Sequence, residues 1–242
     1  MIELFDPKQD YVVRQAQLPH WFQPGVTYFV TFRTADSMPA SRLRLWHAQR
    51  DDWLRRHGID PARSDWQARL RMMPGEAVPH AAFPHTACAG NGVAGTLRVS
   101  TLETEFHRKF TQEFMEYLDQ GHGACLLRNS AAAAEVASAL GHFDGDRYVL
   151  TDYVVMPNHV HVLVCLLGET ELTAQCESWK KYSAGQINAL SGRRGRFWQA
   201  ESFDHLVRTP EHFDYFRQYI ADNPRRAKLK AAEYLHWSRE LK

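Results

Sequence analysis

The hydrophobic and polar positions of this chain follow two periods, one typical of strands and one typical of helices. Apolar residues alternate with polar ones, or run almost without interruption, in four segments that predict β-strands: residues 25–34, 147–156, 159–167 and 197–208, the last interrupted around 200–202. Only Pro157 and Asn158 separate the second segment from the third. So short a connection predicts a tight antiparallel hairpin, and its two apolar strands are expected at the centre of a sheet.

Five further segments have the apolar spacing or the composition of helices: residues 41–57, 101–120, 130–141, 169–190 and 210–227. Capping residues mark several of their ends. Asn129 or Ser130 begins the third helix, Gly141 closes it, and Pro210 suits the first turn of the last one. Residues 73–95 are rich in glycine and proline, show no sustained period, and predict a loop or poorly ordered segment.

The order of these segments predicts the fold. If residues 41–120 form an insertion ahead of the first core helix, the remaining order is strand, helix, strand, strand, helix, strand, helix. This is the split βαβ pattern of a ferredoxin-like fold with one helix added. We therefore expect an α+β protein with one antiparallel sheet and helices on one face. Residues 1–242 should form a single domain that carries a helical and loop insertion at 41–120.

Composition changes this picture only where charge is uneven. With 44% hydrophobic residues and a formal net charge of +1, the chain is ordinary for a folded protein, and its overall charge gives no argument for a nucleic-acid partner. From Gly192 to Lys242, however, eleven Lys and Arg stand against seven Asp and Glu. The C-terminal third is therefore the basic part of the chain, and a nucleic-acid partner has to be argued from such local patches.

Cysteine usage and hydropathy indicate a compartment. The four cysteines, Cys88, Cys125, Cys165 and Cys176, form no CxxC pair, and nothing resembles a secretory leader. Reduced thiols in the cytoplasm are the simplest interpretation. No apolar run reaches the roughly 18 residues that span a bilayer, so we expect no membrane segment.

The most informative polar residues are two histidines in the third strand segment. His159 and His161 are one residue apart, and because side chains alternate along a strand, both imidazoles project to one side. Buried without a partner, such a group costs about 1 to 3 kcal/mol, and a bound metal ion would remove that cost. The alternative is two partly exposed histidines without a ligand, since thirteen histidines make a chance pair ordinary.

A phenol and an amide lie at helical spacing near the C-terminus. Tyr219 and Asn223 are four residues apart, on one face of the last predicted helix, just before Pro224. Two imidazoles and an amide oxygen suit Mg²⁺ or Mn²⁺, with open positions for water and phosphate, better than a closed structural zinc site. Such an ion polarises a phosphate, and tyrosine, with an ordinary pKa of about 10, gains most from that help as a nucleophile. The pattern predicts phosphoryl transfer through a tyrosine.

Two stretches carry a family resemblance. PNHVHVLV, from Pro157, is similar to the HUH motif of single-tyrosine nucleases. YIADNPRRAKL, from Tyr219, resembles the tyrosine segment of IS200-like transposases, especially the REP-associated tyrosine transposases. DYVVMPNHVH, the helix around Trp179, and FWQAESFDHLVR also match, so that the resemblance covers residues 25–34 and 125–229.

The resemblance implies an activity and a site. In such a protein, His159 and His161 would bind a divalent ion, Mg²⁺ or Mn²⁺, Asn223 would complete the protein ligands, and Tyr219 would attack single-stranded DNA. The products would be a 5′-phosphotyrosine link and a free 3′-hydroxyl at REP-like hairpins. The enzyme would act as a monomer or a homodimer. The family's amide ligand is often a glutamine, and Asn223 resembles the REP-type relatives instead.

Two alternatives stay open. Tyr215 lies one turn before Tyr219 on the same helix face, and this Tyr-xxx-Tyr spacing is found in two-tyrosine replication initiators and relaxases. Tyr215 is therefore the competing nucleophile. The other alternative is a domesticated regulator that binds hairpin DNA and does not cut it.

Several residues are candidates for supporting roles. Basic side chains are the candidates for contacts with DNA phosphates: Arg193, Arg194, Arg196, Arg225, Arg226, Lys228 and Lys180. The first three could equally form a solvated loop, and Lys180 could be an ordinary lysine on the surface of a helix. Asp204 and His205 could orient a ligand or a water molecule, or could bond each other at the end of a strand.

Overall fold

A computed structural model of the chain describes residues 2–6, 9, 12–15, 19–63, 66, 69–70, 101–106, 109–110, 113–200 and 202–241. The chain divides into two compact units: Met1–Ser37 with Leu118–Lys242, and Met38–Tyr117. Each unit is described by itself. The loop expected at 73–95 lies outside the described residues.

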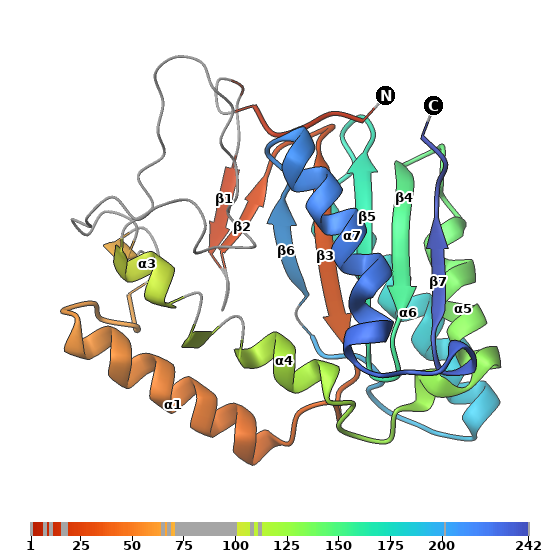
Figure 1. Ribbon diagram of the computed structural model, residues 1–242, viewed down its shortest axis with the longest axis horizontal. Helices are drawn as coiled ribbons and strands as arrows, with labels where there is room; N and C mark the ends of the chain where they lie inside the picture. The colour runs from red at the N-terminus through yellow and green to blue at the C-terminus, as the bar shows by residue number, and fades with distance from the viewer. Residues whose placement is uncertain are drawn as a thin grey trace. The chain divides into compact units, whose positions relative to one another are not determined.

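The first unit is built on a five-stranded sheet of order β6-β3-β5-β4-β7, in which every neighbouring pair is antiparallel (Figure 1). Its strands are β3 (Thr27–Arg33), β4 (Tyr148–Val155), β5 (His159–Leu166), β6 (Phe203–Leu206) and β7 (Leu235–Ser238). The predicted hairpin is confirmed, since β4 pairs with β5 across a short turn. The order of β3 to β6 is that of a split βαβ sheet, so the expected α+β antiparallel fold is confirmed.

Three short strands were not predicted. β7 adds a fifth strand at the edge of the sheet, beside β4. β1 (Val12–Gln15) and β2 (Pro19–Phe22) form a separate two-stranded antiparallel sheet. β6 is shorter than the segment expected at 197–208, because Trp198 makes only an isolated bridge with Thr34. Four residues carry too little periodicity to be recognised in a sequence.

The predicted helices of this unit are present nearly where the sequence places them. They are α5 (Ser130–Gly141), α6 (Leu172–Ser191) and α7 (Pro210–Arg226), with short 3₁₀ helices η3 (Leu126–Arg128) and η4 (Ala231–Glu233). The side-chain oxygen of Asn129 accepts hydrogen bonds from the first backbone N–H groups of α5. Thr209 caps α7 in the same way, through a bond from the backbone N–H of His212. Capping residues thus decide both starts.

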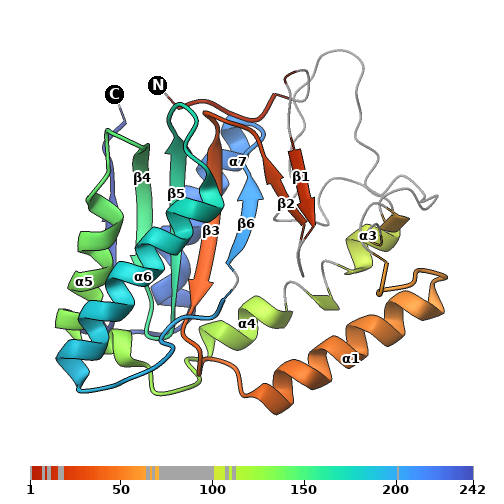
Figure 2. The same ribbon diagram turned by 180° about the vertical axis from the view of Figure 1, so that it is seen from behind.

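The expectation that the helices lie on one face of the sheet is wrong. α5 and α6 pack on one face and α7 packs on the other, as the two opposite views show (Figures 1 and 2). The physical reason is the central strand: every residue of β5 is buried, so both of its sides need a cover. Val160 and Val162 belong to the core under α5 and α6, while Leu163 packs with α7. These sides are called the α5/α6 face and the α7 face below.

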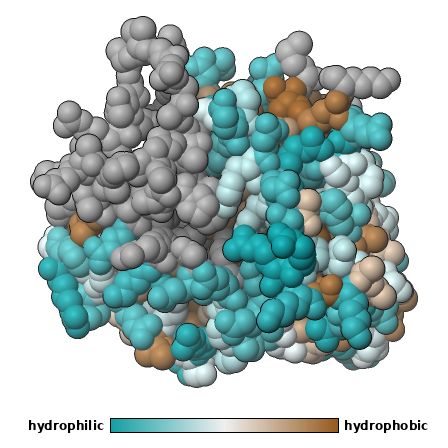
Figure 3. Space-filling view, in the orientation of Figure 1, coloured by the Kyte–Doolittle hydropathy of each residue, from teal (hydrophilic) through white to brown (hydrophobic). Residues whose placement is uncertain are grey.

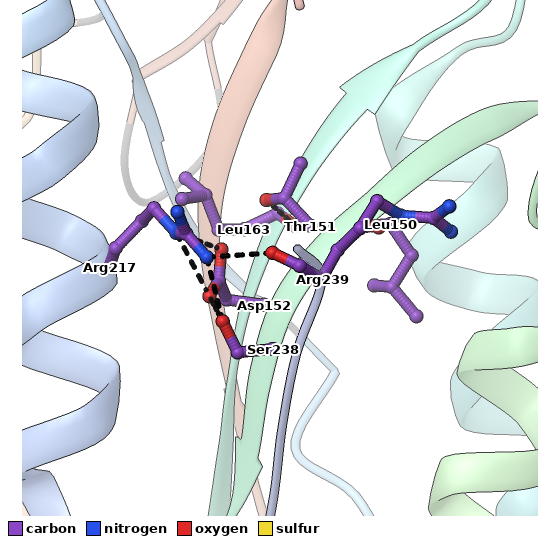
Figure 4. A network of polar contacts seen from close by, with 7 residues as sticks. All are labelled: Leu150, Thr151, Asp152, Leu163, Arg217, Ser238 and Arg239. Atoms are coloured by element: carbon purple, nitrogen blue, oxygen red, sulfur yellow. Dashed lines mark hydrogen bonds and ion pairs between the residues drawn. The ribbon is translucent and has the colours of Figure 1, made fainter. Parts of the chain in front are cut away.

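A buried carboxylate, Asp152 of β4, ties α7 and β7 to the sheet (Figure 4). Nε of Arg217, on α7, donates to both carboxylate oxygens of Asp152, at 3.1 and 3.0 Å. Nη2 of Arg217 donates to Oγ of Ser238 at 2.7 Å and to the carbonyl of Arg239 at 2.9 Å. These bonds hold α7 at one rotation over the sheet. Hydrophilic residues cover much of the outer surface of α7 (Figure 3).

The second unit is helical in its described part. α1 (Ala40–Arg56) confirms the helix expected at 41–57. The single helix expected at 101–120 is described as two, α3 (Thr101–Phe106) and α4 (Glu113–Asp119), with residues 107–108 and 111–112 undescribed. Its core combines aromatic residues such as Trp53 and Phe106 with aliphatic ones such as Leu54 and Ile59. The last residues of α4, from Leu118, belong to the first unit.

Two expectations concern thiols and membranes. Cys125, Cys165 and Cys176 are free thiols, and Cys88 lies outside the described residues. In the part of the chain that the structure describes, no helix has the length and apolar character needed to cross a membrane.

Candidate metal and nucleophile site

The paired histidines begin β5 and face α7. His159 and His161 are each only 1% exposed, so the alternative of partly exposed histidines is wrong. Alternation along β5 explains the placement, because Val160 between them turns to the α5/α6 face. Phe29 stacks on His161 with ring centroids 5.3 Å apart, and the Tyr219 ring meets His161 edge-on at 5.2 Å. The His161 imidazole therefore lies between two aromatic side chains.

A hydrogen bond decides which nitrogen of His159 carries the proton. Nδ1 of His159 lies 2.7 Å from Oδ1 of Asn158. The amide of Asn158 cannot be turned round, because its Nδ2 donates to the carbonyls of Leu118 and His122, at 3.2 and 2.9 Å. Since Oδ1 only accepts, Nδ1 of His159 is the donor. In the neutral ring, Nε2 of His159 therefore presents a lone pair.

His161 has a partner that can either donate or accept. Nδ1 of His161 lies 2.7 Å from the hydroxyl oxygen of Thr31, and the Nε2 atoms of the two histidines are 3.1 Å apart. When Thr31 accepts from Nδ1, both Nε2 lone pairs point into the same space. Two nitrogens bound to one ion at about 2.1 Å and at right angles would be about 3.0 Å apart. The observed spacing fits one shared ion.

Burial keeps both imidazoles neutral. It lowers the pKa of His159 to about 3, and the positive charge of Arg33 acts in the same direction. Burial, and then the neighbouring His159, lowers the pKa of His161 well below its ordinary value. The neutral imidazole is the form that binds a metal ion, so no proton has to be displaced first at neutral pH.

Asn223 of α7 completes the approach to the imidazoles. This residue is fully buried, and its Nδ2 lies 3.4 Å from Nε2 of His161. Its Oδ1 is also buried and has no hydrogen-bond partner among the described residues. Such an oxygen costs about 1–3 kcal/mol. A half-turn of the amide exchanges its nitrogen and oxygen and directs the oxygen at the space between the imidazoles, where a cation would satisfy it.

Tyr219 lies one turn before Asn223 and reaches the same space. Burial, with the charge of Asp119 acting the same way, raises the pKa of Tyr219. The charge of Arg226 and a hydrogen bond from the side chain of Asn223 oppose that rise. The guanidinium of Arg226 lies 5.5 Å from the centroid of the Tyr219 ring. The phenol is therefore neutral at rest and has a cation beside it.

Tyr215 packs next to Tyr219 on the same helix face, as the spacing predicts. Their rings are stacked, with centroids 6.3 Å apart and an interplanar angle of 27°. Tyr215 is half-buried, whereas Tyr219 is 9% exposed. Burial also raises the pKa of Tyr215.

Asp119 joins the paired histidines and was not predicted. Its Oδ1 lies 3.6 Å from Nε2 of His159. Asp119, His159 and His161 together offer three ligand atoms that all lie within 4.8 Å of one another. Asp119 is the last residue of α4, where a negative charge is unfavourable against the helix dipole. That mismatch is the only local signal in its sequence, and it does not point to a particular partner.

Lys180 is separate from this group. It lies on α6, which covers the α5/α6 face, and is only 8% exposed, so its interpretation as a surface lysine is wrong. Its Nζ donates to the carbonyl of Ala200 at 2.6 Å and to Oγ of Ser202 at 3.4 Å. The ammonium group holds the segment that leads into β6.

Asp204 and His205 are neighbours on β6 and point to opposite faces of the sheet. The ring of His205 packs against His212 of α7, with centroids 5.1 Å apart. Asp204 lies on the other face, near Tyr28. Burial raises the pKa of Tyr28, and the negative charge of Asp204 adds to that rise. Neither belongs to the group of ligand atoms around the paired histidines.

The predicted basic residues are exposed at two places: Arg193, Arg194 and Arg196 between α6 and β6, and Arg225, Arg226 and Lys228 at the end of α7. Arg225 forms an ion pair with Asp222 at 3.4 Å, and its side chain is 78% exposed. Arg226 differs because its guanidinium lies over the Tyr219 ring. Contacts of these residues with DNA stay a prediction.

The donor atoms at this site suit a divalent ion. The paired imidazoles offer nitrogen, and Asn223 and Asp119 offer oxygen from two other elements. Oxygen ligands with imidazole are typical of Mn²⁺ and of Mg²⁺ that also binds phosphate. Four protein ligands would leave positions open on an ion that takes six. The arrangement therefore combines a place for a cation with a phenol beside it.

Comparisons with known proteins give little further guidance. No family model and no curated protein matches the chain. A solved structure described as "Structure of the REP associates tyrosine transposase bound to a REP hairpin" is similar at 14% identity and a TM-score of 0.38, over 92% of this chain and 74% of that chain. A likeness of this size assigns no family.

Proposed function

We propose that this protein is a metal-dependent, single-stranded DNA endonuclease and strand transferase that acts at REP-like hairpins through Tyr219. One observation carries the proposal: Tyr219 and Asn223 of α7 meet the paired histidines of β5 in one buried group. Asn223 and His161 are 62 positions apart in the sequence. An apolar core has no need of such a convergence. The hairpin substrate is supported by the sequence resemblance of the two stretches that contain these residues.

The proposed reaction is a transesterification. Oη of Tyr219 attacks a phosphorus atom of the DNA, an Oη–P bond forms, and the bond from phosphorus to the 3′ oxygen breaks. The phenolic proton leaves to water, and the departing 3′ oxygen takes up a proton. The products are a 5′-phosphotyrosine and a 3′-hydroxyl. Because one phosphate ester replaces another, attack by a 3′-hydroxyl rejoins the strand without ATP.

The side chains of the site have separate tasks in this step. His159, His161 and Asn223 would hold a divalent ion, which would polarise the phosphate and stabilise the charge that develops on it. The His161 ring and the Arg226 guanidinium flank the Tyr219 ring and orient the phenol. Arg226 also favours loss of the phenolic proton, because its charge opposes the effect of burial on the pKa of Tyr219.

Formation of a covalent adduct tests this proposal. The full-length protein is incubated with Mn²⁺ and a labelled hairpin that carries a single-stranded flank, and the products are separated on a denaturing gel. The wild type should give a slow band that protease removes, and EDTA should abolish it. Tyr219→Phe should give no such band. Tyr215→Phe, a neighbouring tyrosine on the same helix face, is the matched control and should retain it.

A two-tyrosine mechanism is the second candidate, because Tyr215 stacks on Tyr219. In that mechanism each single variant would still cleave once, and neither would complete strand transfer. An adduct lost only in Tyr215→Phe would show that Tyr219 is not the nucleophile. Hairpin binding without any adduct in Mg²⁺ or Mn²⁺ would show a regulator that does not cut.

A further inference from the structure

Asp119 approaches the paired histidines from the end of α4, about 40 positions before them in the sequence. Its carboxylate is 3.6 Å from Nε2 of His159, and its side chain is 17% exposed. Nδ1 of His159 already donates to Asn158, so the neutral ring has no proton to offer Asp119. Two acceptors therefore face each other at the edge of the proposed ion site. A cation between them would attract both.

One buried side chain accounts for the position of Asp119. Asn158 is fully buried in the turn between β4 and β5, where the sequence predicts only a hairpin connection. Its Nδ2 donates to the carbonyls of Leu118 and His122, at 3.2 and 2.9 Å. Asn158 is therefore bonded to the backbone on both sides of Asp119. Its Oδ1 meanwhile orients His159. A single amide thus sets the direction of two of the converging groups.

Backbone hydrogen bonds add to these contacts around Asp119 and Asn158. The helix α4 ends at Asp119. Just beyond it, the backbone N–H of Gly121 donates to the carbonyl of Leu118 at 3.0 Å. Gly121 has a φ of +69°, a conformation that suits glycine. The carbonyl of Asn158 accepts from the backbone N–H of Thr34 at 2.9 Å, which anchors Asn158 itself to the end of β3. Hydrogen bonds therefore fix the backbone on both sides of Asp119.

We infer that Asp119 is a further protein ligand of the ion, and that Asn158 is the positioning residue that brings Asp119 and His159 to it. The inference rests on the proposed function only in assigning a divalent ion to the paired histidines. A carboxylate lowers the net charge of the occupied site by one and adds the oxygen ligand that Mn²⁺ and Mg²⁺ prefer. It lets the protein hold the ion before any DNA phosphate arrives.

Binding of Mn²⁺ to the full-length protein without DNA tests the inference, by isothermal titration and by the loss of the free-ion signal in electron paramagnetic resonance. Asp119→Asn should weaken binding about 10- to 100-fold, the range typical of groups that support a metal site. Asp36→Asn is the matched control, because Asp36 contacts the same segment through the N–H of Ala124, at 2.9 Å, and an amide oxygen can still accept that bond. It should bind Mn²⁺ within about twofold of the wild type.

A double-mutant cycle tests the role of Asn158. If Asn158 acts largely by placing Asp119, the loss in Asn158→Ala with Asp119→Asn should be clearly smaller than the product of the two single losses. A residue that only stabilises the fold would give the full product. Should Asn158→Ala fail to fold, Asn158→Asp replaces it, because Asp still accepts from His159 but cannot donate to the two carbonyls.

The outcomes separate this inference from the proposed function. If Asp119→Asn binds Mn²⁺ as tightly as the wild type while His161→Ala does not bind it, Asp119 is no ligand and the inference is wrong. A wild type that binds Mn²⁺ through Asp119 but forms no DNA adduct contradicts the proposed function alone. A wild type that binds no Mn²⁺ contradicts both.

Discussion

The α5/α6 face and the α7 face of the sheet are both buried, yet they are filled with different chemistry. On the α5/α6 face, β5 contributes valines, and the polar groups of the large aromatic residues bond within the core. Nε1 of Trp179 donates to the hydroxyl of Tyr148 at 3.0 Å, and that hydroxyl donates to the carbonyl of Leu140 at 2.7 Å. On the α7 face, the same strand contributes His159 and His161.

One strand can serve stability and function together when consecutive residues point to opposite sides. The α5/α6 face satisfies the polar groups named above through fixed bonds within the protein. The α7 face leaves Oδ1 of Asn223 buried without a hydrogen-bond partner among the described residues, and it brings acceptors of His159 and Asp119 together. The unpaired Asn223 oxygen costs about 1–3 kcal/mol. Its position beside the acceptor atoms of His159 and Asp119 is what indicates a ligand.

Two adjacent residues of β5, His161 and Val162, should give the clearest contrast when each is truncated to alanine. His161→Ala should weaken Mn²⁺ binding at least about 100-fold, because the ion loses a ligand held in place by Thr31. Val162→Ala, on the other face, should leave Mn²⁺ binding unchanged and lower the free energy of unfolding by about 2 kcal/mol, because two buried methyl groups are lost. Titration with Mn²⁺ and urea unfolding measure the two effects. Equal loss of Mn²⁺ binding in both variants would show that the faces are not independent.

The next effect concerns the polar attachment of α7. Arg217→Leu should lower the free energy of unfolding by about 2–3 kcal/mol, because Asp152 is 1% exposed and loses its cation. The expected loss is below that of a fully buried pair, since the Arg217 side chain is 28% exposed. Arg225→Leu, on the same helix in an exposed ion pair with Asp222, should change stability by less than about 0.5 kcal/mol. Urea unfolding distinguishes them, and equal losses would mean that α7 is held by its apolar contacts alone.

A smaller effect is expected from the α5/α6 face. Trp179→Phe removes the hydrogen bond to Tyr148 and part of a ring that is 1% exposed, and should cost about 1–2 kcal/mol of stability. Neither Mn²⁺ binding nor the yield of DNA adduct should change at a temperature where the variant is folded. A lower adduct yield with unchanged Mn²⁺ binding would link α6 to the reaction.

The smallest effect on stability is expected at the end of α7. Arg226→Ala should alter the free energy of unfolding by less than about 0.5 kcal/mol. If Arg226 contacts a phosphate, the slope of log affinity for hairpin DNA against log salt concentration should fall by about 1. Fluorescence anisotropy at several salt concentrations measures the slope. An unchanged slope would restrict Arg226 to its contact with Tyr219.

The part of the site that lies within regular elements could be predicted. His159 and His161 share a face because a strand alternates, and Tyr219 and Asn223 share a face because a helix repeats every 3.6 residues. Both shared faces follow from the spacing of residues that are close together in the sequence. The helix boundaries near Asn129 and Thr209 follow equally local capping bonds.

Asp119 could not be predicted, because its place depends on bonds between its neighbours and Asn158, about 40 positions away. β7 was missed for a similar reason: four residues show no clear period, and the strand is held by the contacts of Ser238 with Arg217 and Asp152. The expectation of helices on one face was wrong because a continuous apolar run shows that both faces of a strand are buried but not which helix packs on each face. Only the tertiary packing decides the placement of the helices.

By itself, the sequence determined the order of strands and helices in the central fold, the hairpin that presents the two histidines, and the pairing of a phenol with an amide on one helix. All of these depend on residues near one another in the chain. The tertiary structure alone decided that α7 covers the histidine side of β5, that Arg217 and Asp152 set its rotation, and that Asn158 brings Asp119 to the paired imidazoles. These depend on burial and on hydrogen bonds between distant segments, which form only when the whole sheet and its covers come together.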